Sequence, residues 1–139
     1  MARKDRPIIV SIYAALQMLF GLLILLSGLF ILVIGTAIFT DFVNNVPELA
    51  PLATILAVIW AAFIITGLIV FLIGYGLWKM NVVAWLITII LLGLNTVSIL
   101  LAYDTILFLI EQGAYSFLVP AIIQILLFVY FIKISDKFR

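Results

Sequence analysis

The chain has 139 residues, of which 68% are hydrophobic and only 9% carry a charge, for a net charge of +1. Apolar residues make up about half of an ordinary soluble domain, so this composition excludes one and predicts a single membrane domain over residues 1–139. The sequence contains no cysteine and no histidine. Disulfides, thiol redox chemistry, histidine-ligated haem and zinc sites built on thiolate or imidazole are therefore excluded.

The first predicted element is an apolar run from Ile8 to Phe39 that contains no charged residue. The hydrocarbon core of a bilayer is ~30 Å thick, and ~20 helical residues cross it. The run is longer than that, so we expect a membrane helix that tilts or extends beyond the lipid. A cleaved signal peptide is not expected, because the apolar part is too long and no small-x-small cleavage site follows it.

Small residues recur every seven positions in this run: Ala14, Gly21, Gly28 and Gly35. In the second predicted span, Gly67 and Gly74 have the same spacing. A helix brings such positions to nearly one face, and small residues let helix backbones approach closely in lipid. We interpret them as helix-packing residues. Together with the alanines of the second span (Ala53, Ala57 and Ala61) they exceed what one internal contact needs, which leaves a face for a partner. Glycine is also common in membrane helices for no such reason, and the spacing leaves that interpretation open.

Three further spans are predicted at residues 52–77, 82–102 and 116–132. Turn-forming and charged residues separate the first two spans, because such residues are excluded from hydrocarbon. Residues 104–113 are too short to cross the membrane. We interpret them as an interfacial helix opened by Asp104 as N-cap and closed by Gly113, or alternatively as a frayed extension of the third span. The predicted fold is an all-α bundle of four transmembrane helices.

The basic residues predict how this bundle is oriented. All seven lysines and arginines lie before the first span, between the second and third, or after the fourth: Arg3, Lys4, Arg6, Lys79, Lys133, Lys137 and Arg139. The loops on the other side hold only acidic charges. Because basic segments stay in the cytoplasm, we expect a multi-pass protein of the cytoplasmic membrane with both termini cytoplasmic.

None of the four predicted spans contains Asp, Glu, Lys or Arg. Membrane enzymes and proton-coupled transporters normally keep an ionisable side chain inside the membrane. We therefore expect no autonomous active site, no catalytic residue, no metal site and no cofactor. The expected partners are the lipid bilayer and other membrane subunits or further copies of the chain, and not nucleic acid.

The costly polar residues inside the spans are the amides Gln17, Asn95 and Gln124. Gln17 and Gln124 are estimated at ~14 Å and ~12 Å from the cytoplasmic end, and Asn95 at ~20 Å. We expect Gln17 and Gln124 to be neighbours on antiparallel helices and to form an interhelical hydrogen bond. A polar track or ligand site lined by these amides is the alternative.

Three stretches resemble small four-helix archaeal and bacterial membrane proteins of unknown function. They are Arg6-Pro7-Ile8-Ile9-Val10 with Gln17 and Gly21, then Gly74-Tyr75-Gly76-Leu77-Trp78-Lys79, and Ala84-Trp85. The resemblance implies no activity.

Two functions are compatible with this sequence. The first is a non-catalytic accessory or structural subunit that packs in a larger membrane complex. The alternative is a small oligomeric transporter or channel. The absence of a membrane-embedded acid and the one-sided distribution of basic residues both disfavour that alternative.

Overall fold

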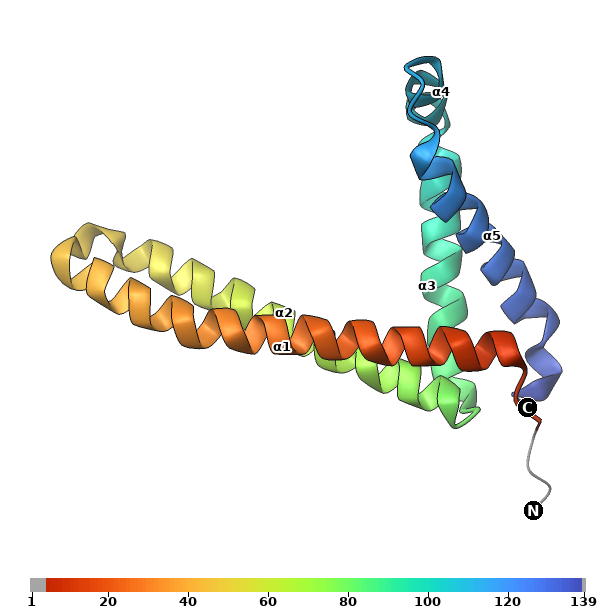
Figure 1. Cartoon of the computed structure of the whole chain (residues 1–139), viewed down its shortest axis with the longest axis horizontal. Coiled ribbons are helices and arrows are strands. Elements are labelled where there is room, and N and C mark those ends of the chain that lie inside the picture. The colour runs from red at the N-terminus through yellow and green to blue at the C-terminus, as the bar shows by residue number, and fades with distance from the viewer. Residues whose placement is uncertain (1–4, 139) are drawn as a thin grey trace. The chain divides into compact units, whose positions relative to one another are not determined.

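The computed structural model describes residues 5–138, and every regular element in that range is helical. The five α-helices are α1 (Ile8–Asn45), α2 (Ala50–Trp78), α3 (Val82–Leu101), α4 (Tyr103–Glu111) and α5 (Leu118–Lys133) (Figure 1). Four segments are long and apolar enough to cross a membrane: Ile8–Asn45, Pro47–Trp78, Val82–Leu101 and Tyr115–Lys133. The prediction of an all-α chain with four such helices is confirmed.

The chain divides into two compact units. The first is Pro7–Trp78, which holds α1 and α2, and the second contains the residues from Lys79 onward, with α3, α4 and α5. The single membrane domain stays a prediction.

In the first unit, α1 and α2 lie side by side as an antiparallel hairpin (Figure 1). Helix α1 continues to Asn45, beyond the predicted end at Phe39. The reason is that polar side chains in its last turns bond to their own helix: the Thr40 hydroxyl donates to the Thr36 carbonyl at 2.6 Å, and the Asn45 amide to the Asp41 carbonyl at 2.9 Å. These side chains satisfy themselves locally and so do not end the helix.

A short 3₁₀ turn, Pro47–Leu49, joins the two helices of this hairpin. Helix α2 then begins at Ala50, with Pro51 in its first turn. A proline costs little there, because the first N–H groups of a helix have no partner within it.

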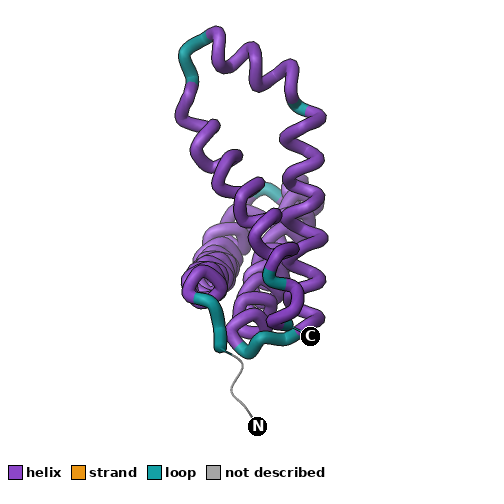
Figure 2. The backbone as a smooth tube through the Cα atoms, turned by 90° about the vertical axis from the view of Figure 1, so that its right-hand side faces the viewer, coloured by secondary structure: helices purple, strands orange, loops and turns teal. Residues whose placement is uncertain are grey.

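In the second unit, α3 packs against α5, and α4 with its flanking loops joins their ends (Figure 2). Helix α3 begins at an N-cap residue, Asn81, whose side-chain oxygen accepts from the Val83 N–H at 2.8 Å. Helix α5 follows a 3₁₀ turn, Tyr115–Phe117, and carries Pro120 in its first turn.

The segment predicted at 104–113 is a separate short helix, α4, that follows α3 after one residue. Asp104 is not its N-cap; Ala102 occupies that position and no side chain caps the helix. The near-helical backbone of Ala102 links α3 to α4 through the Ile106 N–H, which donates to the Ala102 carbonyl at 2.9 Å. The carboxylate of Asp104 therefore lies inside the first turn of α4, where it still complements the helix dipole.

Gly113 does close α4, as predicted. Its φ is +77°, the left-handed conformation that glycine adopts without strain. The Gly113 N–H donates to the Ile110 carbonyl at 3.0 Å, and the Ala114 N–H donates to the Leu109 carbonyl at 3.0 Å. This pair of bonds is a Schellman motif, which satisfies two of the last carbonyls of the helix.

Candidate functional site

Two glycines, Gly21 and Gly67, bring the backbones of α1 and α2 close together. Both are buried. A Cβ atom added to Gly21 would overlap the backbone nitrogen of Phe71, and one added to Gly67 would lie 2.5 Å from the backbone nitrogen of Leu25. Neither helix has a side chain between the two backbones here, so the contact exists only because both residues are glycine.

The remaining small residues that were predicted to pack helices continue this contact in both directions. A Cβ on Gly74 would lie 3.0 Å from the carbonyl oxygen of Ala14. A Cβ on Gly28 would lie 2.9 Å from the Ile64 side chain, and one on Gly35 would overlap the indole ring of Trp60. We call this row of contacts the glycine seam. All six residues predicted to pack helices belong to it, so the glycine seam is an internal contact of the hairpin.

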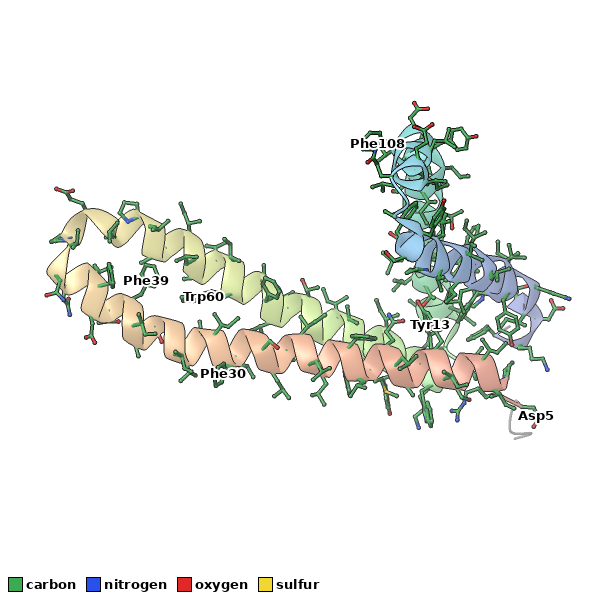
Figure 3. The ribbon with its side chains drawn as sticks, turned by 45° about the horizontal axis from the view of Figure 1, so that its top comes forward. Asp5, Tyr13, Phe30, Phe39, Trp60 and Phe108 are labelled. Atoms are coloured by element: carbon green, nitrogen blue, oxygen red, sulfur yellow. The ribbon has the colours of Figure 1, made fainter. Side chains whose placement is uncertain are left out.

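Towards the loop, larger side chains of α2 meet the seam, and an open pocket of about 280 Å³ lies between the two helices. The ring of Trp60 lies over Gly35 and meets the ring of Phe39 edge to face, with centroids 6.2 Å apart (Figure 3). The pocket is lined by Thr36, Phe39, Thr40, Val43, Asn44, Ala53, Ala57 and Trp60. Sequence reasoning missed this pocket, because it depends on which α2 residue comes opposite Gly35.

The polar groups of the pocket are neutral. The Thr36 hydroxyl donates to the Leu32 carbonyl at 2.7 Å, and the Thr40 hydroxyl donates within α1 as well, so each offers only acceptor lone pairs. The Asn44 side chain makes no hydrogen bond within residues 5–138. The lining contains no acid and no base, which suits it to binding and not to proton transfer.

The intramembrane amides lie in both units. In the first unit, the side-chain oxygen of Gln17 is buried and has no hydrogen-bond donor among the described residues. In the second, Gln124 is half-buried and Asn95 is exposed, and neither side chain forms a hydrogen bond within that unit. Gln17 and Gln124 belong to different units, so their pairing stays a prediction.

A second feature that sequence reasoning missed is a contact between Trp85, near the start of α3, and the end of α5. The Trp85 indole N–H donates to the Phe131 carbonyl at 3.0 Å. That carbonyl belongs to the last turn of α5, where the indole adds a hydrogen bond from another helix. The 3₁₀ turn Ser135–Lys137 brings Phe138 back onto Trp85, and their rings stack with centroids 5.9 Å apart. Trp85 thus holds the C-terminal end of α5 and the segment after it.

No group of three or more acidic, histidine or cysteine side chains that could hold a metal ion is present in the described part of the chain. Comparison with protein-family models, with curated proteins and with solved structures finds no match for this chain.

Proposed function

We propose that this chain is a non-catalytic integral membrane protein that packs as an accessory or structural subunit in a larger membrane complex. The observation that carries the proposal is the exposed amide of Asn95, ~20 Å along α3, which forms no hydrogen bond within its unit. An amide facing hydrocarbon without a partner loses the hydrogen bonds that it makes in water. A neighbouring membrane helix that offers a donor and an acceptor removes this cost.

The chemistry of the spans agrees with a role that involves no reaction. No Asp, Glu, Lys or Arg occurs in residues 8–39, 52–77, 82–102 or 116–132. General acid-base catalysis and proton-coupled transport both depend on such groups at depth. The protein is accordingly proposed to act through its helix surfaces. The resemblance to small four-helix membrane proteins is compatible with this role and adds no activity to it.

The proposal includes an orientation and a location. With all basic residues in three segments that four spans bring to one side, both termini lie in the cytoplasm and the protein spans the cytoplasmic membrane. Any partner helices are therefore expected in the same membrane.

Purification of the tagged chain from native membranes in a mild detergent tests the subunit role. We expect other membrane proteins to copurify at fixed stoichiometry, and Asn95→Leu to reduce their recovery. Ser98→Ala, one turn further along α3, is the matched control, because the Ser98 hydroxyl donates to the Leu94 carbonyl of its own helix at 2.9 Å. A chain that runs alone as a monomer from native membranes would contradict the proposal.

The same amide leaves one alternative, a small oligomeric transporter or channel formed by copies of this chain. An asparagine side chain carries donors and an acceptor, so two copies can satisfy each other. In that case the purified chain is a homo-oligomer that conducts a small solute in liposomes and loses both properties in Asn95→Leu. An oligomer that conducts nothing favours the structural role.

A further inference from the structure

Three lysines gather at one end of the second unit, around the contact between Trp85 and the end of α5. Lys79 lies six residues before Trp85, and Lys133, the last residue of α5, lies two residues after Phe131. The Trp85 indole N–H donates to the Phe131 carbonyl at 3.0 Å, so these two lysines belong to the same end of the helix pair. The third, Lys137, ends the 3₁₀ turn that follows α5. All three lysines are exposed.

The segment after α5 is folded back onto the helix pair. Phe138 is fully buried, and its ring stacks on that of Trp85 with centroids 5.9 Å apart. Two backbone bonds shape the turn before it: the Lys137 N–H donates to the Ile134 carbonyl at 3.0 Å, and the Phe138 N–H donates to the Ser135 carbonyl at 3.1 Å. Lys137 is therefore held close to the start of α3 and the end of α5.

Lys133 and Lys137 are neighbours whose charges are not neutralised locally. They lie four positions apart in successive helical turns, a spacing that brings side chains to one side of the chain. Asp136 lies between them in the sequence, but within residues 5–138 it forms no ion pair with either lysine. Two ammonium groups at neighbouring positions repel each other, and an anion that both approach removes the repulsion.

These lysines lie at the depth of the lipid headgroups. Val82–Leu101 and Tyr115–Lys133 are two of the segments that are long and apolar enough to cross a membrane. Lys79 comes three residues before the first of them, about 4.5 Å of helix, and Lys133 ends the second. The headgroup region adds about 5–8 Å on each side of the hydrocarbon. The phosphates of the lipids are the anions of that region.

We propose that Lys133 and Lys137, with Lys79 at the same end of the unit, bind the phosphate of an anionic phospholipid. A zwitterionic lipid carries its own cation beside the phosphate, which the lysines repel, so charge complementarity selects the anionic lipid. The preference of basic segments for the cytoplasm depends on charge alone. The burial of Phe138 adds what that preference does not require, a fixed position for Lys137.

Lipid titration of the purified full chain tests this site. The chain in detergent is titrated with phosphatidylglycerol or with phosphatidylcholine, and native mass spectrometry counts the lipids bound to each chain. We expect the first phosphatidylglycerol to bind more tightly than phosphatidylcholine. Lys133→Gln with Lys137→Gln should weaken its affinity about fivefold for each lysine removed and leave phosphatidylcholine unaffected. Equal affinity for the two lipids in the unchanged chain would overturn the site.

A matched variant separates the site from net charge. Asn44→Asp with Gln112→Glu lowers the net charge by the same two units, but at exposed positions near the acidic residues Asp41 and Glu111. It should leave the affinity for phosphatidylglycerol unchanged. A loss as large as that of the lysine pair would show that the lipid responds to the charge of the whole chain.

Phe138→Ala separates a fixed site from a charged tail, because it keeps all three lysines. With Lys137 released and Lys133 still on α5, the affinity for phosphatidylglycerol should fall about fivefold, as for the loss of one lysine. Asp136→Asn should strengthen binding, since it removes the one acid beside the site. Unchanged affinity in Phe138→Ala would overturn the fixed site, and displacement of the lipid by inorganic phosphate would contradict a lipid ligand. The inference does not depend on the subunit role, because a chain that purifies alone can still bind the lipid.

Discussion

Gly21 and Gly67 face each other across the hairpin: a Cβ on Gly21 would lie 2.8 Å from the Gly67 carbonyl oxygen, and one on Gly67 would lie 2.9 Å from the Gly21 carbonyl oxygen. The relationship is reciprocal because each glycine lies against the backbone of the other helix. Each glycine leaves room for the other's backbone and for no side chain.

This geometry predicts a gradient of sensitivity along the glycine seam. Gly21→Ala places a methyl group against backbone atoms that have nowhere to move, so we expect a loss of stability at the upper end of the ~1–3 kcal/mol typical of overpacking. Gly28→Ala mainly meets the Ile64 side chain, which can change rotamer, so it should cost less, whereas Gly28→Leu should cost as much as Gly21→Ala. Thermal unfolding midpoints of the three variants in detergent measure the order of these stability losses. Equal midpoints for Gly21→Ala and the unchanged protein would show that the two helices are not in backbone contact.

The contact of Trp85 with α5 predicts a separable hydrogen-bond contribution in the second unit. Trp85→Phe keeps an aromatic ring on Phe138 but removes the donor to the Phe131 carbonyl, which should lower stability by about 1 kcal/mol. Phe138→Ala removes the ring partner instead and should loosen the end of the chain. Limited proteolysis after residue 133 measures that loosening. If Trp85→Phe changes neither the unfolding midpoint nor the cleavage rate, the indole does not hold α5.

The two glutamines are predicted to be coupled. Gln17 has a buried oxygen without a donor among the described residues, and Gln124 has amide hydrogens to give. If they pair, Gln17→Leu and Gln124→Leu each destabilise by roughly 0.6 kcal/mol or more, and the double variant costs less than the sum. Strictly additive effects would mean that the two amides are not neighbours, and unchanged stability with loss of binding or assembly would favour the ligand-site alternative.

Orientation is open to a labelling experiment, because the chain has no cysteine of its own. A single cysteine introduced at Asp41 should react with a membrane-impermeant maleimide added to intact cells, and one at Asp136 should react only after the membrane is opened. The expectation follows from the basic residues around Asp136 and their absence near Asp41. Reaction of the cysteine at position 136 in intact cells would contradict the proposed orientation.

Helix periodicity explains why part of this architecture was predictable. A residue every seven positions must return to nearly one helix face, so the alignment of Gly21 with Gly28 follows from geometry alone. The end of α1 could not be predicted from the sequence. Thr40 and Asn45 are turn formers in general, but here they bond to carbonyls of their own helix. The prediction of Asp104 as N-cap was wrong for a different reason: α4 already begins at Tyr103, with Ala102 as its N-cap.

Contacts between distant residues were beyond the reach of sequence patterns. The pocket requires Trp60 to come opposite Gly35, and the indole contact requires Trp85 to meet the end of α5 forty-six residues later. Both depend on the register of one helix against another, which periodicity within each helix does not set.

Site-specific photo-crosslinking at position 95 in native membranes tests the proposed subunit role most directly. A photoreactive residue there should crosslink to a second polypeptide of the membrane. The same photoreactive residue in place of Leu100, which is 65% exposed, should crosslink to lipid. Mass spectrometry of the adducts identifies what is joined. A partner protein captured at 95 and lipid captured at 100 is the predicted result; lipid alone, or this same chain alone, at both positions would contradict the subunit role.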